Sequence, residues 1–87
     1  TLNLSRVDVN LYRAALEKLN REDTRYEALR KHVIRVTECG SPGKVDRTIR
    51  GLLRNGWAIK LGSKGSQTSY RITEKGKLFL QSLQSNP

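Results

Sequence analysis

The sequence of 87 residues is short of the side chains that form disulfides, metal sites and membrane spans. Its single cysteine, Cys39, excludes an internal disulfide, and its single histidine, His32, argues against a zinc-type metal site. No apolar run approaches the roughly 20 residues that cross a bilayer, and no basic segment followed by an apolar leader is present. We therefore expect one small cytoplasmic domain over residues 1–87, with no cofactor.

Acidic side chains are also scarce, because 8 Asp and Glu stand against 17 Lys and Arg and leave a net charge of +9. The imbalance lies in the second half of the chain. Residues 1–39 carry 8 basic and 6 acidic side chains, net +2, whereas residues 40–87 carry 9 and 2, net +7. Charge of one sign gathered in half of a small protein predicts a polyanionic partner, since such charge governs association rather than fold.

Apolar residues recur at helical spacing in four segments. We therefore expect four helices, at about residues 6–21, 25–38, 42–54 and 74–84. Between the third and fourth segments the period changes to two, with Trp57, Ile59 and Leu61 before a Gly-rich tip and Tyr70 and Ile72 after it. This alternation predicts a β-hairpin at about 57–72. The predicted fold class is thus α+β, mainly α.

Polar residues and a glycine mark the expected helix ends. Ser5 and Thr24 are each followed three residues later by an acidic residue, which is the spacing of a capping box at the first and second helices. Gly40 is expected to end the second helix in a left-handed conformation. Ser41 as N-cap and Pro42 as first helical residue predict where the third helix begins.

The first expected helix has a wider apolar surface than one core contact needs. Beside its main stripe, Leu4, Leu11 and Ala15 form an adjoining strip. The strip fits a helix that is buried on two sides within the monomer. It equally fits a homodimer surface, to which Leu78 of the last helix would contribute because it lies opposite that helix's apolar face.

The third expected helix is strongly amphipathic when it is drawn at 100° per residue. Its apolar side carries Val45, Ile49, Leu52 and Leu53. Its opposite side carries Arg47, Arg50 and Arg54, with Lys44 and Thr48 toward one edge. An ordinary solvated face mixes charges, whereas only Asp46 is acidic here, and like charges at this spacing repel. The major groove of duplex DNA accepts such a helix, and arginine pairs bidentately with guanine edges and phosphates.

Two further stretches suit contact with nucleic acid. The hairpin carries basic and polar side chains that fit phosphate or minor-groove contact, namely Lys60, Lys64, Gln67 and Arg71. At the start of the third helix, Ser41, Gly43 and Lys44 lie where free backbone N–H groups can hold a phosphate. Each stretch also has an ordinary interpretation, as a turn of common turn residues and as simple helix capping.

The order helix, helix, turn, basic helix, strand, Gly-rich loop, strand, helix resembles the winged helix-turn-helix superfamily of DNA-binding proteins. Residues 70–77 (Tyr-Arg-Ile-Thr-Glu-Lys-Gly-Lys) are similar to a pattern frequent in its prokaryotic transcription regulators, including the PadR-like and MarR-like groups. The resemblance covers about residues 8–84. It implies a three-helix core, a two-stranded wing and a C-terminal helix. It also implies that the wing tip places Lys64 on DNA and that the major groove is read by Lys44, Arg47, Thr48, Arg50 and Arg54.

No catalytic set appears, and we expect no enzymatic activity. A nucleophile pair of Cys39 and His32 would lack a third, orienting residue. Residues 40–44 (Gly-Ser-Pro-Gly-Lys) do not form a phosphate-binding P-loop, because two residues rather than four separate the glycines and Val45 follows the lysine.

The leading interpretation is a small, dimeric transcription regulator that binds duplex DNA in the nucleoid. Three alternatives stay open. A plasmid-partition or chromatin-organising protein would bind DNA with little sequence preference. A KH-like module would clamp single-stranded RNA with residues 40–43 (Gly-Ser-Pro-Gly), although a KH domain needs a strand before its first helix. A winged-helix module that binds protein would normally lack the arginine face.

Overall fold

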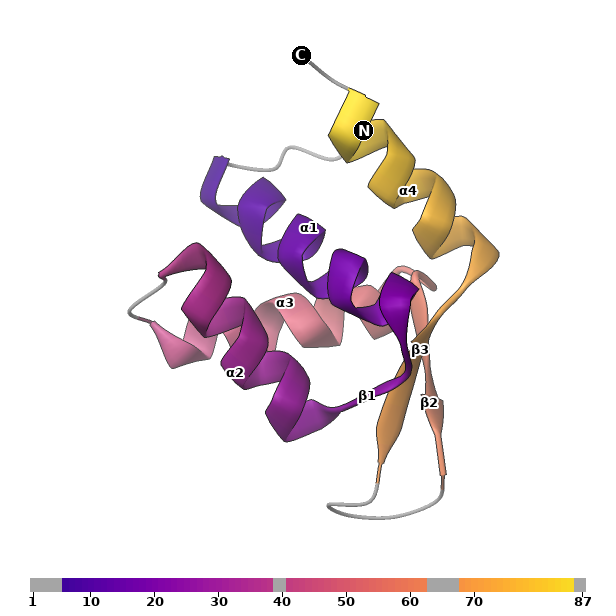
Figure 1. Cartoon of the computed structure of the whole chain (residues 1–87), viewed down its shortest axis with the longest axis horizontal. Helices are drawn as coiled ribbons and strands as arrows, with labels where there is room; N and C mark the ends of the chain where they lie inside the picture. Colours follow the sequence, from indigo (N-terminus) through magenta and orange to yellow (C-terminus); the bar gives the residue numbers. More distant parts are fainter. Residues whose placement is uncertain (1–5, 39–40, 63–67, 86–87) are drawn as a thin grey trace.

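The computed structural model describes residues 6–38, 41–62 and 68–85. Its helices, in chain order, are α1 (Arg6–Arg21), α2 (Tyr26–Thr37), α3 (Pro42–Arg54) and α4 (Glu74–Ser85). Its strands are β1 (Thr24–Arg25), β2 (Ala58–Leu61) and β3 (Ser69–Ile72). In Figure 1, α1, α2 and α3 form a cluster, the β2–β3 hairpin projects from it, and α4 lies beside α1. The predicted fold class, a mainly helical α+β winged helix, is confirmed.

The core lies where α1 meets the other helices. Leu11 and Leu16 of α1 pack with Leu29 and Val33 of α2 and with Ile49 of α3, and each of these side chains is at most 1% exposed. Full burial of an aliphatic side chain stabilises a fold by about 1.5–3 kcal/mol. The amphipathic pattern of the helices therefore decides how they assemble and which side of α3 faces water.

The wide apolar surface of α1 is used within the monomer. Leu11 and Ala15 are both 0% exposed, because α1 packs against α2, α3 and α4 together. The predicted homodimer surface through these two residues is therefore wrong. Leu4 lies outside the described residues, and Leu78 on α4 is 66% exposed.

The sheet contains a third strand that the sequence did not predict. β1 pairs antiparallel with β3, in the order β1–β3–β2, and places Thr24 opposite Tyr70. The predicted capping box at Thr24 is wrong, because Arg25 is the N-cap of α2 and the Thr24 hydroxyl donates to the carbonyl oxygen of Glu22 at 3.0 Å. Thr24 thus serves the sheet, and β1 ties the start of α2 to the hairpin.

The link between α2 and α3 differs in part from the expected one. The C-cap of α2 is Glu38, which has left-handed backbone angles (φ 53°, ψ 32°). That conformation was expected at Gly40, which lies outside the described residues together with Cys39 and with Ser5, the expected cap of α1. Ser41 is the N-cap of α3, as predicted.

The burial of β2 does not follow the predicted alternation of apolar and polar residues. Ala58 is buried opposite Ile72, whereas Ile59 is 46% exposed opposite Arg71. Trp57 precedes the strand and enters the core, where it stacks on Phe79 with ring centroids 3.8 Å apart. Because Trp57 and Ala58 are both buried, the period of two expected from Trp57 onward is broken at the start of the strand.

Residues 70–77, which carry the family resemblance, join the hairpin to α4. The Thr73 hydroxyl oxygen accepts the N–H of Gly76 at 3.0 Å and so caps the start of α4, and the same hydroxyl donates to the carbonyl oxygen of Gly56 at 2.6 Å. A Cβ on Gly76 would overlap the carbonyl oxygen of Trp57. The Thr-x-x-Gly pattern is therefore explained by packing at this joint.

Candidate nucleic-acid interface

The α3 helix is fixed from behind and at both ends. Its buried side consists of Val45, Ile49 and Leu52. At its start, the backbone of Ser41 is extended and the carbonyl oxygen accepts the N–H of Lys44 at 3.1 Å. At its end, the side-chain amide of Asn55 donates to the carbonyl oxygen of Gly51 at 2.9 Å. The helix therefore presents its other side to solvent in a fixed orientation.

The solvent side of α3, which we call the basic face, consists of Lys44, Arg47, Arg50 and Arg54. All four side chains are exposed. Within the part of the chain that the structure describes, none of the four takes part in an ion pair. Like charges spaced three or four residues apart on a helix repel one another, so an anionic partner would relieve a repulsion that folding leaves in place.

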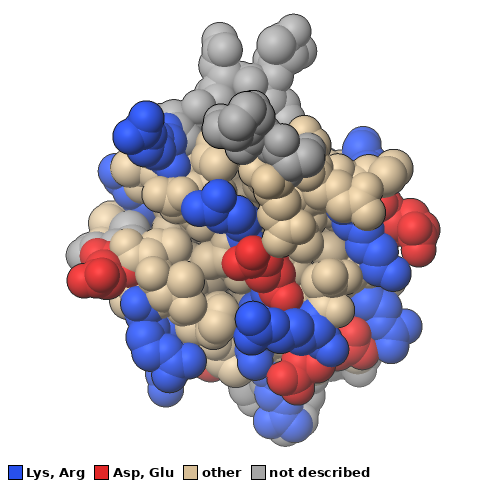
Figure 2. Space-filling model, turned by 45° about the horizontal axis from the view of Figure 1, so that its top comes forward, with Lys and Arg blue, Asp and Glu red and all other residues tan. Residues whose placement is uncertain are grey.

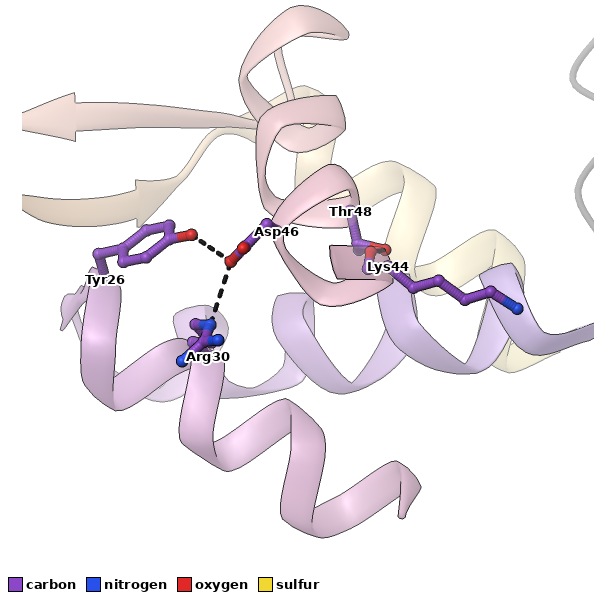
Figure 3. A network of polar contacts seen from close by, with 5 residues as sticks. All are labelled: Tyr26, Arg30, Lys44, Asp46 and Thr48. Atoms are coloured by element: carbon purple, nitrogen blue, oxygen red, sulfur yellow. Dashed lines mark hydrogen bonds and ion pairs between the residues drawn. The ribbon is translucent and has the colours of Figure 1, made fainter. Parts of the chain in front are cut away.

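The one carboxylate of α3, Asp46, is turned away from the basic face and toward α2. Its Oδ1 accepts a hydrogen bond from the Tyr26 hydroxyl and another from Nε of Arg30, the latter at 3.1 Å (Figure 3). Burial and the bond to Asp46 raise the pKa of Tyr26 from 10.0 to about 12. Figure 3 shows Lys44 extending from the opposite side of α3. Asp46 therefore joins α2 to α3 and does not neutralise the basic face.

Thr48 does not lie on the basic face, which corrects its predicted exposure. It is 4% exposed, and its hydroxyl donates to the carbonyl oxygen of Lys44 at 2.9 Å. This edge of α3 is covered by α1, since Gly51 on the same edge is buried against the phenol of Tyr12. A helical wheel places Thr48 beside Lys44 but does not show which edge a neighbouring helix covers. Thr48 is therefore removed from the candidate contacts.

The hairpin contributes fewer free cations than expected. Lys60 on β2 is exposed, but Arg71 on β3 is engaged with Asp23, with Nε to Oδ1 at 3.1 Å and Nη2 to Oδ2 at 2.8 Å. The hydrogen bond from Arg71 lowers the pKa of Asp23, and the same bond raises the pKa of Arg71. The pairing of β1 with β3 explains the contact, because it brings Asp23 beside the hairpin. Lys64 and Gln67 lie outside the described residues.

Two residues of this region were missed by sequence reasoning. Arg25 is exposed and lies opposite Ser69 in the β1–β3 pairing, so it adds a positive charge beside the hairpin. A strand of two residues has no periodicity from which to predict it. Tyr12 lies on α1 at the spacing of its apolar residues, but its hydroxyl reaches the edge of α3 at Gly51. Nothing in its spacing distinguishes it from a core residue.

Other parts of the surface have a different charge pattern. On the face shown in Figure 2, Lys and Arg side chains lie beside Asp and Glu side chains. At the end of α1, Lys18 Nζ pairs with Glu22 Oε2 at 3.2 Å. The concentration of cations on α3 is therefore a local feature rather than a simple result of the net charge.

The described residues contain no helix with both the length and the apolar character needed to cross a membrane. Within the same residues, no three His, Cys, Asp or Glu side chains come together as a group that could hold a metal ion.

The chain is similar to the crystal structure of TA0346 from Thermoplasma acidophilum, a proposed transcriptional regulator. The two chains share 28% sequence identity and superpose with a TM-score of 0.64, over 87% of this chain and 80% of the other. No protein-family model matches the sequence. No curated protein matches it significantly either.

Proposed function

We propose that this protein is a transcription regulator that binds duplex DNA, with α3 in the major groove and the β2–β3 hairpin against the backbone or the minor groove. The observation that carries the proposal is the basic face of α3, since the one carboxylate of that helix, Asp46, is turned away from it and bonded to Tyr26 and Arg30. The similarity to TA0346, itself a proposed transcriptional regulator, supports the same function. A PadR-like or MarR-like assignment rests on the pattern at residues 70–77 alone.

The position of each cation along α3 suggests a division of roles. Arg47 and Arg50 lie in the middle of the helix, where a helix in the major groove comes closest to base edges. Lys44 and Arg54 lie near its ends, where the backbone of each DNA strand passes. Ser41 and Gly43 at the helix start, and Lys60 on the hairpin, are proposed as additional phosphate contacts.

The test is affinity for duplexes selected from a random pool, measured by fluorescence anisotropy. Arg47→Ala and Arg50→Ala should each weaken binding to the selected duplex by about 1–3 kcal/mol and relax preference at one base pair. Arg35→Ala is the matched control, because it removes the same charge from an exposed position on α2. Equal losses for Arg35→Ala and the α3 variants would contradict the proposal.

The footprint on DNA separates the variants of this function. A short bounded site indicates a regulator, whereas extended protection indicates a partition or chromatin-organising protein. Two protected half-sites centred roughly 10 base pairs apart, or a multiple of that spacing, would show a dimer on DNA. Stronger competition by single-stranded RNA than by duplex DNA would favour the KH-like alternative, although Arg6–Arg21 is a helix where a KH domain requires a strand.

A further inference from the structure

A hollow of about 370 Å³ lies between the N-terminal half of α1 and the edge of α3. Its α3 wall includes the exposed side chains of Lys44, Arg47 and Arg54, and its α1 wall includes Asp8 and Tyr12. This volume lies within the range of about 300–1,000 Å³ that small-ligand sites occupy in proteins. Three cations and one carboxylate give the walls a formal charge of +2.

The Tyr12 side chain lines the hollow and packs against two other aromatic rings. Its ring makes edge contacts with Trp57, at a centroid distance of 5.3 Å, and with Phe79, at 6.1 Å. The side chain reaches α3 only because Gly51 has no Cβ, which would overlap the Tyr12 hydroxyl oxygen. Burial and the charge of Asp8 raise the pKa of this phenol, so it stays a protonated donor at neutral pH.

The Tyr12 hydroxyl is available to a ligand. Among the described residues it makes no hydrogen bond, and none of their buried side-chain oxygen or nitrogen atoms is left without a partner. The oxygen therefore meets solvent in the hollow. Cations and a neutral hydroxyl donor both bind phosphate oxygens through charge-assisted hydrogen bonds. The net charge of +2 suffices for the single negative charge of a DNA phosphate and for the −1.5 to −2 of a phosphate monoester.

We propose that this hollow is a phosphate seat, in which Lys44, Arg47 and Arg54 supply charge and the Tyr12 hydroxyl donates a hydrogen bond. The phosphate belongs either to the backbone of bound DNA or to a free phosphorylated small molecule. The DNA source rests on the proposed function, since Lys44, Arg47 and Arg54 are all part of the basic face. If the source is a free ligand, that ligand and DNA compete for the same three cations, and occupation of the seat regulates DNA binding.

The seat itself is tested with inorganic phosphate at constant ionic strength, by following backbone amide signals of the full chain in NMR spectra. Phosphate should shift the amides of Lys44, Gly51 and Asn55, and Tyr12→Phe should weaken its affinity about tenfold, since a hydrogen bond to a charged group is lost. Tyr70→Phe is the matched control, because it removes a phenol hydroxyl outside the hollow. Equal affinity in Tyr12→Phe and the parent protein, or shifts confined to other regions, would overturn the proposal. An unchanged melting temperature of Tyr12→Phe checks its folding.

Duplex binding by the same variants distinguishes the two sources. If Tyr12→Phe weakens every duplex equally, the seat holds a DNA phosphate. If duplex affinity is unchanged and phosphate displaces DNA from the parent but not from Tyr12→Phe, the seat holds a free ligand. If the parent binds phosphate through Tyr12 but binds no duplex, the proposed function fails and the seat stands.

Discussion

At the scale of single residues, the closest approach between α1 and α3 depends on one missing side chain. Gly51→Ala should destabilise the protein by about 1–3 kcal/mol, the usual cost of overpacking, because the new Cβ would overlap the Tyr12 hydroxyl. Tyr12→Phe in the same chain should restore part of this loss. It would not restore all of it, since the Cβ would still lie 3.2 Å from Cζ of the ring.

Urea denaturation of the parent, both single variants and the double variant measures this coupling. Additive losses in the double variant would show that the contact between Gly51 and Tyr12 is not the cause.

Glu38 adopts a backbone conformation that favours glycine. Its φ of 53° lies in the left-handed region, where a side chain costs roughly 1–2 kcal/mol. Glu38→Gly should therefore stabilise the fold by up to about 1 kcal/mol, because the greater freedom of glycine in the unfolded chain offsets part of the gain. A gain of that size raises the melting temperature by about 4–8 °C in a domain of this length.

Glu27→Gly on α2 is the control, and we expect it to lower stability, the opposite of the change expected for Glu38→Gly. Glu27 lies in the first turn of α2, and glycine within a helix costs about 0.5–1 kcal/mol. A lower melting temperature for both variants would mean that the Glu38 conformation is not strained.

At the scale of elements, the hydrogen bond from Tyr26 of α2 to Asp46 of α3 should make the stability of the fold decrease at alkaline pH. Below pH 10 the Tyr26 phenol is neutral in both the folded and the unfolded protein, so its contribution is fully present. Between pH 10 and about 12 the unfolded phenol ionises while the folded one, whose pKa is raised, stays protonated. The free energy of unfolding should therefore fall as pH rises through this window.

Urea midpoints at one pH below 10 and one between 10 and 12 test this prediction. Tyr26→Phe should show a smaller fall than the parent. A remaining fall is expected from Tyr12 and Tyr70, whose pKa values burial also raises. An identical fall in parent and variant would contradict the assignment to Tyr26.

Beside the β1–β3 pairing, Asp23 holds Arg71 in an ion pair, so Arg71 is not free to contact DNA. Asp23→Asn should release Arg71 and raise affinity for any duplex, with a salt slope steeper by about 0.9 for one added phosphate contact. The fold should persist, because the pair is exposed and such pairs contribute about 0–1 kcal/mol. Glu22→Gln is the matched control, because it removes the same charge from the ion pair with Lys18 at the end of α1. If both variants change the slope equally, net charge rather than Arg71 is responsible.

At the scale of the whole molecule, the proposed interface sets the response of DNA affinity to salt. Contact with about four to six phosphates predicts a slope of roughly −4 to −5 for log affinity against log salt concentration. Fluorescence anisotropy across a range of salt concentrations measures it. A flat response would show that the basic face does not meet the DNA backbone.

Sequence periodicity predicted the long elements and failed where a contact joins distant parts of the chain. The pattern of Val45, Ile49 and Leu52 placed α3 and its basic face correctly, because burial of one side decides the orientation of a helix. The pairing of Arg71 with Asp23 joins residues 48 positions apart and follows from β1, which is too short to have a period.

The sequence also could not show which side of each helix a neighbouring element covers. The burial of Thr48, Leu11 and Ala15 depends on which neighbour covers each edge of a helix, and a helical wheel does not contain that information. The turning of Asp46 toward Tyr26 is of the same kind, because the two residues are 20 positions apart. The candidate site could thus be located on α3 from the sequence. Which residues at its edges are exposed could be seen only from the packing of the helices.

The short β1 strand has a further consequence for the proposed complex. It attaches the hairpin to the start of α2, while Asp46 attaches α2 to α3, so the spacing between helix and hairpin is set on two sides. A protein braced in this way cannot adjust its shape to each target. The double helix must bend or narrow its groove instead, and steps that deform easily, such as TA and CA, would then be favoured at positions that no side chain touches.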